Sequence, residues 1–413
     1  MSEKGAHMQA LRIPKVFYGT ATRLPFPDNF FDAVFTDPPY YDNVPYSDLS
    51  DFFYVWLKRT VGDLYPDLFA TPLTPKSEEI VADASKVGGD MERAKARFEE
   101  MLTQAFREIR RVLKPDGIAV IVFAYKTTEA WETVINALLN ADLYLTASWP
   151  IHTEMEARLR AQESAALASS IYMVCRKRAK EETADFAKVQ EEIRKNLQER
   201  LPEFWRQGIR GADFFMSAIG PAVEAFGKYA KVVKLSGEAV SVRELLDFAR
   251  RVTAEFAVRQ ILENGHLGAV DLQTQFYLLW RWSYGRARME FDEARKLAQA
   301  RGVDLAALER QGLVENKKGE VRLLGPQERQ KWPERFSTMI DVLQRACALW
   351  KKGAEKELDD LLQSTFGPME AFWQVAQAIA ETLPEGDEER RLLHGLLGHR
   401  PRLKAHGPDL FSN

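Results

Sequence analysis

The chain has little cysteine, no long apolar run and no strong excess of either charge. Cys175 and Cys347 are the only cysteines in 413 residues, which argues against a disulfide framework and against a cysteine-based zinc site. No apolar stretch approaches the roughly 18 residues that a membrane-spanning helix needs. Residues 1–10 also lack the apolar centre of a signal peptide. We therefore expect a cytoplasmic protein with no membrane partner.

The charges nearly cancel, with 57 Lys and Arg against 60 Asp and Glu and a formal net charge of −3. A global basic field is therefore absent, and a polyanion would have to meet a local basic patch. The six histidines show no pairing typical of metal ligands, so we predict no metal site. With 46% hydrophobic residues, the chain can bury a substantial core, and its length suits two domains.

Residues 1–178 alternate predicted strands and helices, the pattern of an α/β domain with a largely parallel sheet. The apolar run 117–123 predicts a strand buried on both faces. Just before it, Lys114-Pro115-Asp116-Gly117 predicts the end of a helix and a turn of the chain. The other expected strands cover residues 31–36, 143–149 and 171–176, and the expected helices cover 47–59, 98–113 and 129–140.

Residues 179–413 are predicted to form a mostly helical domain. Within it, residues 290–325 differ, because two short helices at 291–300 and 305–311 precede a hairpin at 314–324. Lys317-Lys318-Gly319 would form the hairpin tip. Two helices and a hairpin predict a winged-helix-like unit, which could contact DNA, contact a protein or serve packing alone.

The motif that carries chemistry is Asp37-Pro38-Pro39-Tyr40, directly after the strand at 31–36. Ligands of open α/β sheets bind beyond the carboxyl ends of the strands, so the motif lies where a site is expected. An exocyclic amine on an aromatic ring is a poor nucleophile, and acceptors that hold its two hydrogens favour the reactive form. The Asp37 carboxylate and the Pro38 carbonyl can be those acceptors, because consecutive prolines fix the backbone.

Tyr40 offers a flat ring on which a base can stack, and a duplex base would first be flipped out. Tyr41, Asp42, Asn43 and Tyr46 follow closely and are candidates to line the base pocket, although ordinary loop packing explains them as well. A stiff loop after a strand is also a complete explanation of the four-residue motif taken by itself.

Segment 35–44, Phe-Thr-Asp-Pro-Pro-Tyr-Tyr-Asp-Asn-Val, resembles the amino-methylating DNA methyltransferases, which modify adenine N6 or cytosine N4. Nearly the whole chain is similar to the C-terminal half of the large bacterial and archaeal adenine-specific DNA methylases, often found beside restriction or phage-defence genes. Segments 149–154, 166–170, 218–221 and 276–282 share in this likeness. The resemblance implies a Rossmann-like methyltransferase sheet, S-adenosyl-L-methionine as methyl donor, DNA as substrate and catalysis at Asp37-Pro38-Pro39-Tyr40.

One departure from that family concerns the cofactor. Its usual glycine-rich turn after the first strand is missing, and Gly19, Thr20 and Ala21 are the remaining candidates for cofactor contact. We therefore expect an incomplete sheet, with a second polypeptide or an upstream segment supplying the cofactor half. The alternatives are an N4-cytosine or RNA amino-methyltransferase, and a catalytically degenerate subunit that binds DNA or a partner.

Two further features bear on these alternatives. Cys175 lies in an apolar strand and is predicted to be core, which disfavours covalent methylation through a cysteine nucleophile. The densest basic run of the first half could contact phosphates or could be a solvated strand end. Its members are Arg158, Arg160, Arg176, Lys177, Arg178 and Lys180.

Overall fold

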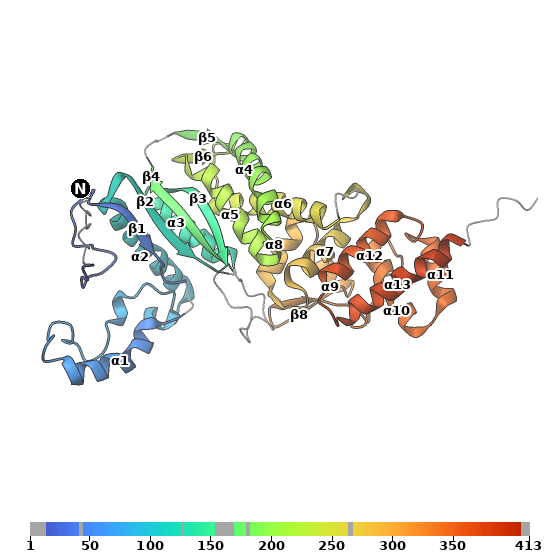
Figure 1. The fold of residues 1–413 in the computed structure, drawn as a ribbon, viewed down its shortest axis with the longest axis horizontal. Coiled ribbons are helices and arrows are strands. Elements are labelled where there is room, and N and C mark those ends of the chain that lie inside the picture. Colours follow the sequence, from blue (N-terminus) through green and yellow to red (C-terminus); the bar gives the residue numbers. More distant parts are fainter. Residues whose placement is uncertain are drawn as a thin grey trace, which may run out of the picture.

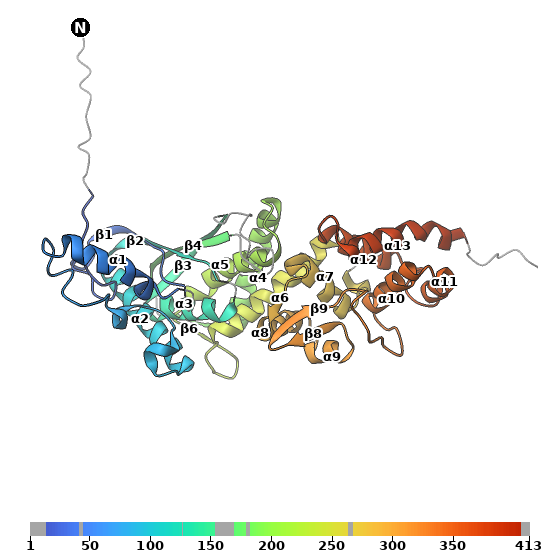
Figure 2. The ribbon, with the colours of Figure 1, turned by 90° about the horizontal axis from the view of Figure 1, so that it is seen from below.

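A computed structural model describes residues 14–40, 44–125, 127–152, 169–178, 182–262 and 267–405. The molecule is elongated, with the main sheet at one end, the winged unit near the middle and a group of helices at the other end (Figures 1 and 2). The fold is mixed α/β, as the alternating pattern predicts.

The main sheet has four strands in the order β1-β2-β4-β3. The pair β1 and β2 is parallel, whereas β4 is antiparallel to both of its neighbours. The prediction of a largely parallel sheet was therefore wrong: β4 returns beside β3 and inserts between it and β2. The strands are β1 (Phe31–Thr36), β2 (Leu113–Phe123), β3 (Leu143–His152) and β4 (Ser169–Lys177).

The predicted turn at residues 114–117 is instead part of β2, although it interrupts the pairing. Phe31 pairs with Leu113 whereas Ala33 pairs with Ile118, so residues 114–117 lie opposite Asp32 in an irregularity of the register. Pro115 cannot donate a ladder hydrogen bond, which accounts for the interruption. Before it, helix α2 (Met91–Val112) ends where the backbone of Leu113 becomes extended.

One face of the sheet is buried and the other is partly open. Ala119 and Ile121 of β2 are fully buried, whereas Ile118 and Val120, which alternate with them, are partly exposed. The prediction that this strand is buried on both faces was wrong, because helices cover a single side. Helices α2 and α3 (Thr128–Asn140) lie on that side (Figure 2), and α5 (Gly211–Gly227) packs closely on β3.

The predicted domain boundary at 178/179 falls between β4 and the next strand. Helix α5, which packs on the sheet, lies beyond this boundary. Part of the cover of the sheet therefore comes from beyond that boundary. Two short strands, β5 and β6, pair in parallel there and were not predicted. The elements between the sheet and the winged unit are β5 (Thr183–Asp185), α4 (Phe186–Arg206), α5, β6 (Lys231–Val233), α6 (Val242–Ile261) and the short η4 (Leu267–Ala269).

The winged-helix-like unit has the predicted elements, one additional strand, and the helix before them, which lies outside the predicted range 290–325. Its three-stranded sheet has the order β7-β9-β8, with β9 antiparallel to both neighbours. Lys318 and Gly319 form the tip of the hairpin with positive φ angles of 55° and 84°. The elements are α7 (Leu272–Tyr284), β7 (Met289–Glu290), α8 (Phe291–Ala300), α9 (Leu305–Arg310), β8 (Val314–Lys317) and β9 (Glu320–Leu323).

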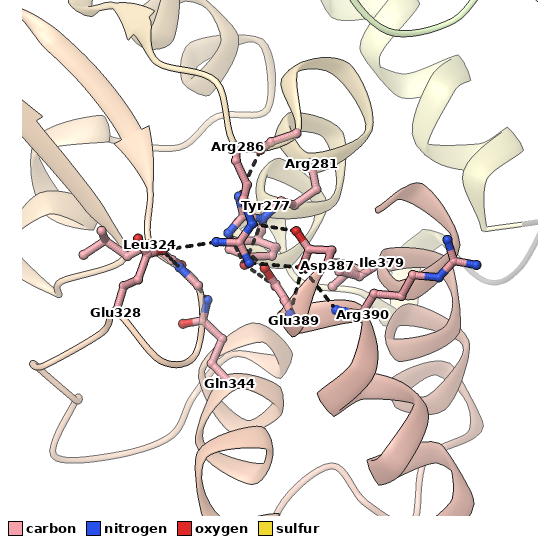
Figure 3. A network of polar contacts seen from close by, with 12 residues as sticks. Tyr277, Arg281, Arg286, Leu324, Glu328, Gln344, Ile379, Asp387, Glu389 and Arg390 are labelled. Atoms are coloured by element: carbon pink, nitrogen blue, oxygen red, sulfur yellow. Dashed lines mark hydrogen bonds and ion pairs between the residues drawn. The ribbon is translucent and has the colours of Figure 1, made fainter. Parts of the chain in front are cut away.

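Four further helices follow the winged unit in the described part of the chain. Buried ion pairs between charged side chains link them to that unit. The guanidinium of Arg281 on α7 lies 3.0 Å from the carboxylate of Glu389 on the last helix, and both side chains are almost fully buried. The Tyr277 hydroxyl contacts both groups, and Arg286 pairs with Asp387 (Figure 3). The helices are α10 (Met339–Lys352), α11 (Glu355–Ser364), α12 (Glu370–Thr382) and α13 (Glu388–Ala405).

Candidate functional site

The Asp37-Pro38-Pro39-Tyr40 motif leaves the carboxyl end of β1, as its position in the sequence predicts. Pro38 is buried, Pro39 and Tyr40 are partly buried, and Asp37 is exposed. Neither proline can donate a backbone hydrogen bond, so β1 stops pairing where the motif begins. An exposed carboxylate thus stands on a backbone segment of restricted conformation.

Tyr40 joins the ends of the two parallel strands. Its ring packs edge-on against Phe123, the last residue of β2, with 5.4 Å between ring centroids. Its hydroxyl hydrogen-bonds the Asp37 carboxylate, and burial together with that carboxylate raises the pKa of Tyr40. The tyrosine therefore stays a neutral donor to Asp37, and the two side chains predicted to be catalytic are in contact.

Helix α1 (Tyr46–Val61) follows the motif and is held mainly by polar contacts, together with a ring contact between Tyr54 and Phe69. The Ser47 amide and hydroxyl both donate to Glu79, and Lys76 forms an ion pair with Asp51 at 2.6 Å. These partners lie in or beside the short helix η1 (Lys76–Glu78), which precedes η2 (Ala84–Val87). No residue of α1 is buried.

Of the residues predicted to line the substrate pocket, only Tyr46 lies among the described residues. Tyr46 begins α1 and is exposed. Tyr41, Asp42 and Asn43 lie outside the described residues.

The predicted cofactor residues do not form a site among themselves. Gly19, Thr20 and Ala21 are all exposed in a tight turn closed by the bridge between Thr20 and Arg23. A side chain placed at Gly19 would meet only Pro25, at 3.7 Å, so no close cradle surrounds that backbone. The residues present therefore do not fit S-adenosyl-L-methionine without further protein around them.

Residues that the sequence did not single out connect the end of β2 to the winged unit. Helix α3 begins just beyond β2, and the Glu293 carboxylate of α8 accepts from both the amide and the hydroxyl of Thr128, each at 3.0 Å. Arg250 and Lys296 also contact this carboxylate. Burial alone would raise the pKa of Glu293, but the two cations and the Thr128 amide hold it below its usual range.

The basic run of the first half is used for structure where it is described. Arg176 donates to the Asp116 carbonyl, Lys177 to Asn29, and Arg178 to the carbonyls of Leu139 and Tyr229. These contacts favour the interpretation as a strand end rather than a phosphate site. Arg158, Arg160 and Lys180 lie outside the described residues.

Cys175 is fully buried, as predicted, and burial raises the pKa of its thiol to about 12. A thiol held in its neutral form away from solvent is a poor nucleophile. The described residues hold no group of three or more His, Cys, Asp or Glu arranged to bind a metal ion. In the same part of the chain, no helix has the length and apolar character needed to cross a membrane.

Comparison with known families adds one match. Residues 271–389 match the model of a domain of unknown function, DUF8807. The matched range begins at Asp271, whose carboxylate caps α7, and ends at Glu389, the partner of Arg281. It therefore covers the winged unit and most of the helices that the buried charges join to it. Searches of curated proteins and of solved structures found no match for this chain.

Proposed function

We propose that this chain is the catalytic half of an S-adenosyl-L-methionine-dependent methyltransferase that acts on adenine N6 in DNA. The observation that carries the proposal is the exposed Asp37 carboxylate beside Tyr40, where the parallel strands β1 and β2 end. Acidic and aromatic groups at this edge of an α/β sheet are suited to an amino group on a planar ring.

In this proposal the chain's own residues hold and orient the amino group. The Asp37 carboxylate and the Pro38 carbonyl accept its two hydrogens, and the Tyr40 ring supports the flipped base. The Tyr40 hydroxyl must first release the carboxylate that it contacts in the structure. The methyl group comes from the cofactor, which this chain does not hold by itself.

The open side of the sheet supports a partner that supplies the cofactor half. Phe35, Val120 and Val174 are aligned across three strands, and all three are at least partly exposed. Among the described residues, β1 pairs only with β2, so its outer edge is unpaired. Parallel sheets of α/β proteins are normally covered on both faces. We propose that strands carrying the missing glycine-rich turn extend the sheet at β1, from a second polypeptide or an upstream segment.

A restriction-modification or phage-defence setting follows from the resemblance of nearly the whole chain to the large adenine-specific methylases, and so does the choice of adenine. The same acceptors would serve cytosine N4 in DNA or an amino group in RNA. A degenerate subunit that only binds DNA or a partner is the second candidate. It is favoured by the contact that occupies Asp37 and by the exposed turn at residues 19–21.

The deciding experiment measures transfer of tritiated methyl groups to DNA, with and without the product of an adjacent reading frame that carries a glycine-rich turn. Asp37→Ala should reduce incorporation by about a hundredfold or more, since it removes a preorganised acceptor. Asp37→Asn keeps one acceptor oxygen and should retain more activity than alanine. Asp32→Ala, which changes an exposed aspartate on β1 just before the motif, is the matched control and should leave incorporation unchanged.

Equal incorporation by the wild type and by Asp37→Ala would remove the catalytic assignment. If no protein transfers methyl groups even with the partner present, the degenerate subunit becomes the better description. Methylated cytosine or RNA in the product analysis would replace adenine as the acceptor.

A further inference from the structure

The winged unit carries a second feature that is independent of the Asp37 corner. Its helices α8 and α9 are joined by the short turn Gly302-Val303-Asp304, with φ of 70° at the glycine and the Asp304 carboxylate accepting from the Ala306 amide. The β8–β9 hairpin follows directly. This is a helix-turn-helix with a hairpin beside its second helix, an arrangement that can place a helix in the major groove of DNA.

The exposed surface of this unit is polar and carries both signs of charge, so it does not suit an apolar protein surface. Every residue from 286 to 325 is described, and Phe291 is the one large apolar side chain there that is exposed. Ala306 and Ala307 are small, so the first turn of α9 presents no bulky side chain to an approaching duplex. Its last turn exposes both Glu309 and Arg310, and Arg310 lies 3.7 Å from Asp304.

The hairpin tip adds two adjacent lysines. Lys317 and Lys318 are both exposed, and Lys318 has no ion pair with any described residue. Lys317 lies 2.9 Å from Glu315, an exposed pair of the kind that contributes little energy and that a phosphate can replace. Figure 2 places β8, β9 and α9 at the margin of the molecule, where a duplex can reach them.

The position of the unit relative to the sheet is also fixed. Glu293 of α8 caps the first turn of α3, which starts beyond the carboxyl end of β2. That strand end is also where Phe123 contacts Tyr40. One buried carboxylate thus ties the winged unit to the edge of the sheet that carries the motif.

We propose that α9 and the hairpin tip bind duplex DNA, with Lys317 and Lys318 contacting backbone phosphates. The use of that DNA as substrate rests on the proposed function, but the binding itself can be measured without methyl transfer. Such contacts position the duplex without reading its sequence, so specificity must come from other groups.

The test is fluorescence anisotropy of a labelled DNA duplex with the full chain over a series of salt concentrations. Lys317→Ala/Lys318→Ala should weaken binding about five- to tenfold and lower the salt slope by about two, one for each lost phosphate contact. Lys351→Ala/Lys352→Ala is the matched control, because it removes an adjacent lysine pair at the end of α10. The control should bind like the wild type. Lys317→Arg/Lys318→Arg should restore binding, since both charges remain.

Equal binding and an equal salt slope for the two double-alanine variants would overturn the proposal, as would the absence of any duplex binding by the full chain at low salt. Capture of a protein by the hairpin tip without binding of DNA would favour a protein partner and would also overturn it. The failure of this inference is distinguishable from failure of the catalytic proposal. If the lysine substitutions do not change duplex binding, the methyl-transfer comparison of Asp37→Ala with the wild type can still be made. If Asp37→Ala does not change methyl transfer, the binding comparison can still be made.

Discussion

Aromatic side chains are exposed in the amino-terminal region but buried in the unit at residues 271–389. In α1, Phe52, Phe53 and Trp56 are 66%, 65% and 55% exposed. In the other unit, Phe372 and Trp373 are 0% and 3% exposed. Both regions carry enough aromatic surface for a core, but only the second folds that surface onto itself. The exposed aromatic side chains of α1, which no described residue buries, are suited to contact with another polypeptide.

The polar contacts show the same contrast. At β1, Lys114 pairs with Asp32 in the open, with side chains 41% and 86% exposed. In the carboxyl-terminal unit, the side chains of Arg281 and Glu389 are 0% and 3% exposed. A surface pair contributes little to stability, whereas breaking a buried pair leaves a charge without solvent. The difference supports the proposal that a partner covers the amino-terminal region, whereas the unit at 271–389 buries its own charged groups.

The largest effect should come from matched tryptophan substitutions in the two regions. Trp373→Ala removes a buried ring whose indole N–H donates to the Gly367 carbonyl, and should cost about 3–5 kcal/mol of unfolding free energy. Trp56→Ala removes an exposed ring and should cost less than about 0.5 kcal/mol in the isolated chain. Urea denaturation of both variants measures the difference.

A large loss for Trp56→Ala in the isolated chain would contradict the comparison, because α1 would then be part of a core. Adding the proposed partner should sharpen the result. The partner's affinity should fall for Trp56→Ala.

How far the sequence leads depends on how local each feature is. The winged unit was predicted nearly residue by residue, because short helices, a Gly-Val-Asp turn and a Lys-Lys-Gly tip each have local signals. The strand at 31–36 and the motif after it were located for the same reason. The insertion of β4 between β2 and β3 was missed, since the order of strands depends on contacts between distant segments.

The buried ion pairs could not be predicted from the sequence either. Arg281 is the lone arginine of the aromatic stretch 276–282, which is the one local sign of a buried acid nearby. Its partner Glu389 lies more than a hundred residues away in the sequence. Glu293 gives no local sign that it caps α3. The half-open sheet was missed because the apolar run in β2 predicts cover on both faces, whereas the described residues cover only one.

Matched cation substitutions test the polar side of the comparison. Arg281→Met leaves Glu389 buried without its cation, and should cost about 3 kcal/mol. Lys114→Met breaks the exposed pair with Asp32 and should change stability by less than about 0.5 kcal/mol. The unfolding midpoint in urea, measured at neutral pH, separates the two, and similar losses for both would show that exposure does not set the value of these pairs.

The smallest predicted effect is that of a substitution at Glu224 on α5, one of the helices that cover the sheet. Burial raises the pKa of Glu224 to about 7, against the opposing charges of Arg200 and Lys228, and one of its oxygens has no hydrogen-bond partner among the described residues. Because the folded pKa is the higher one, folding is penalised as the pH rises from about 4.5, where the unfolded chain ionises, to about 7.

Glu224→Gln is neutral at every pH and escapes this penalty. After allowance for solvent screening, the variant should be more stable than the wild type by about 1 kcal/mol at pH 8 and similar to it at pH 5. Urea denaturation at the two pH values measures this. Equal stability at both would mean that Glu224 is ionised at no cost, and therefore that α5 is less tightly closed over the sheet than its burial indicates. In that case the covered face, and not only the open one, would be available to a partner.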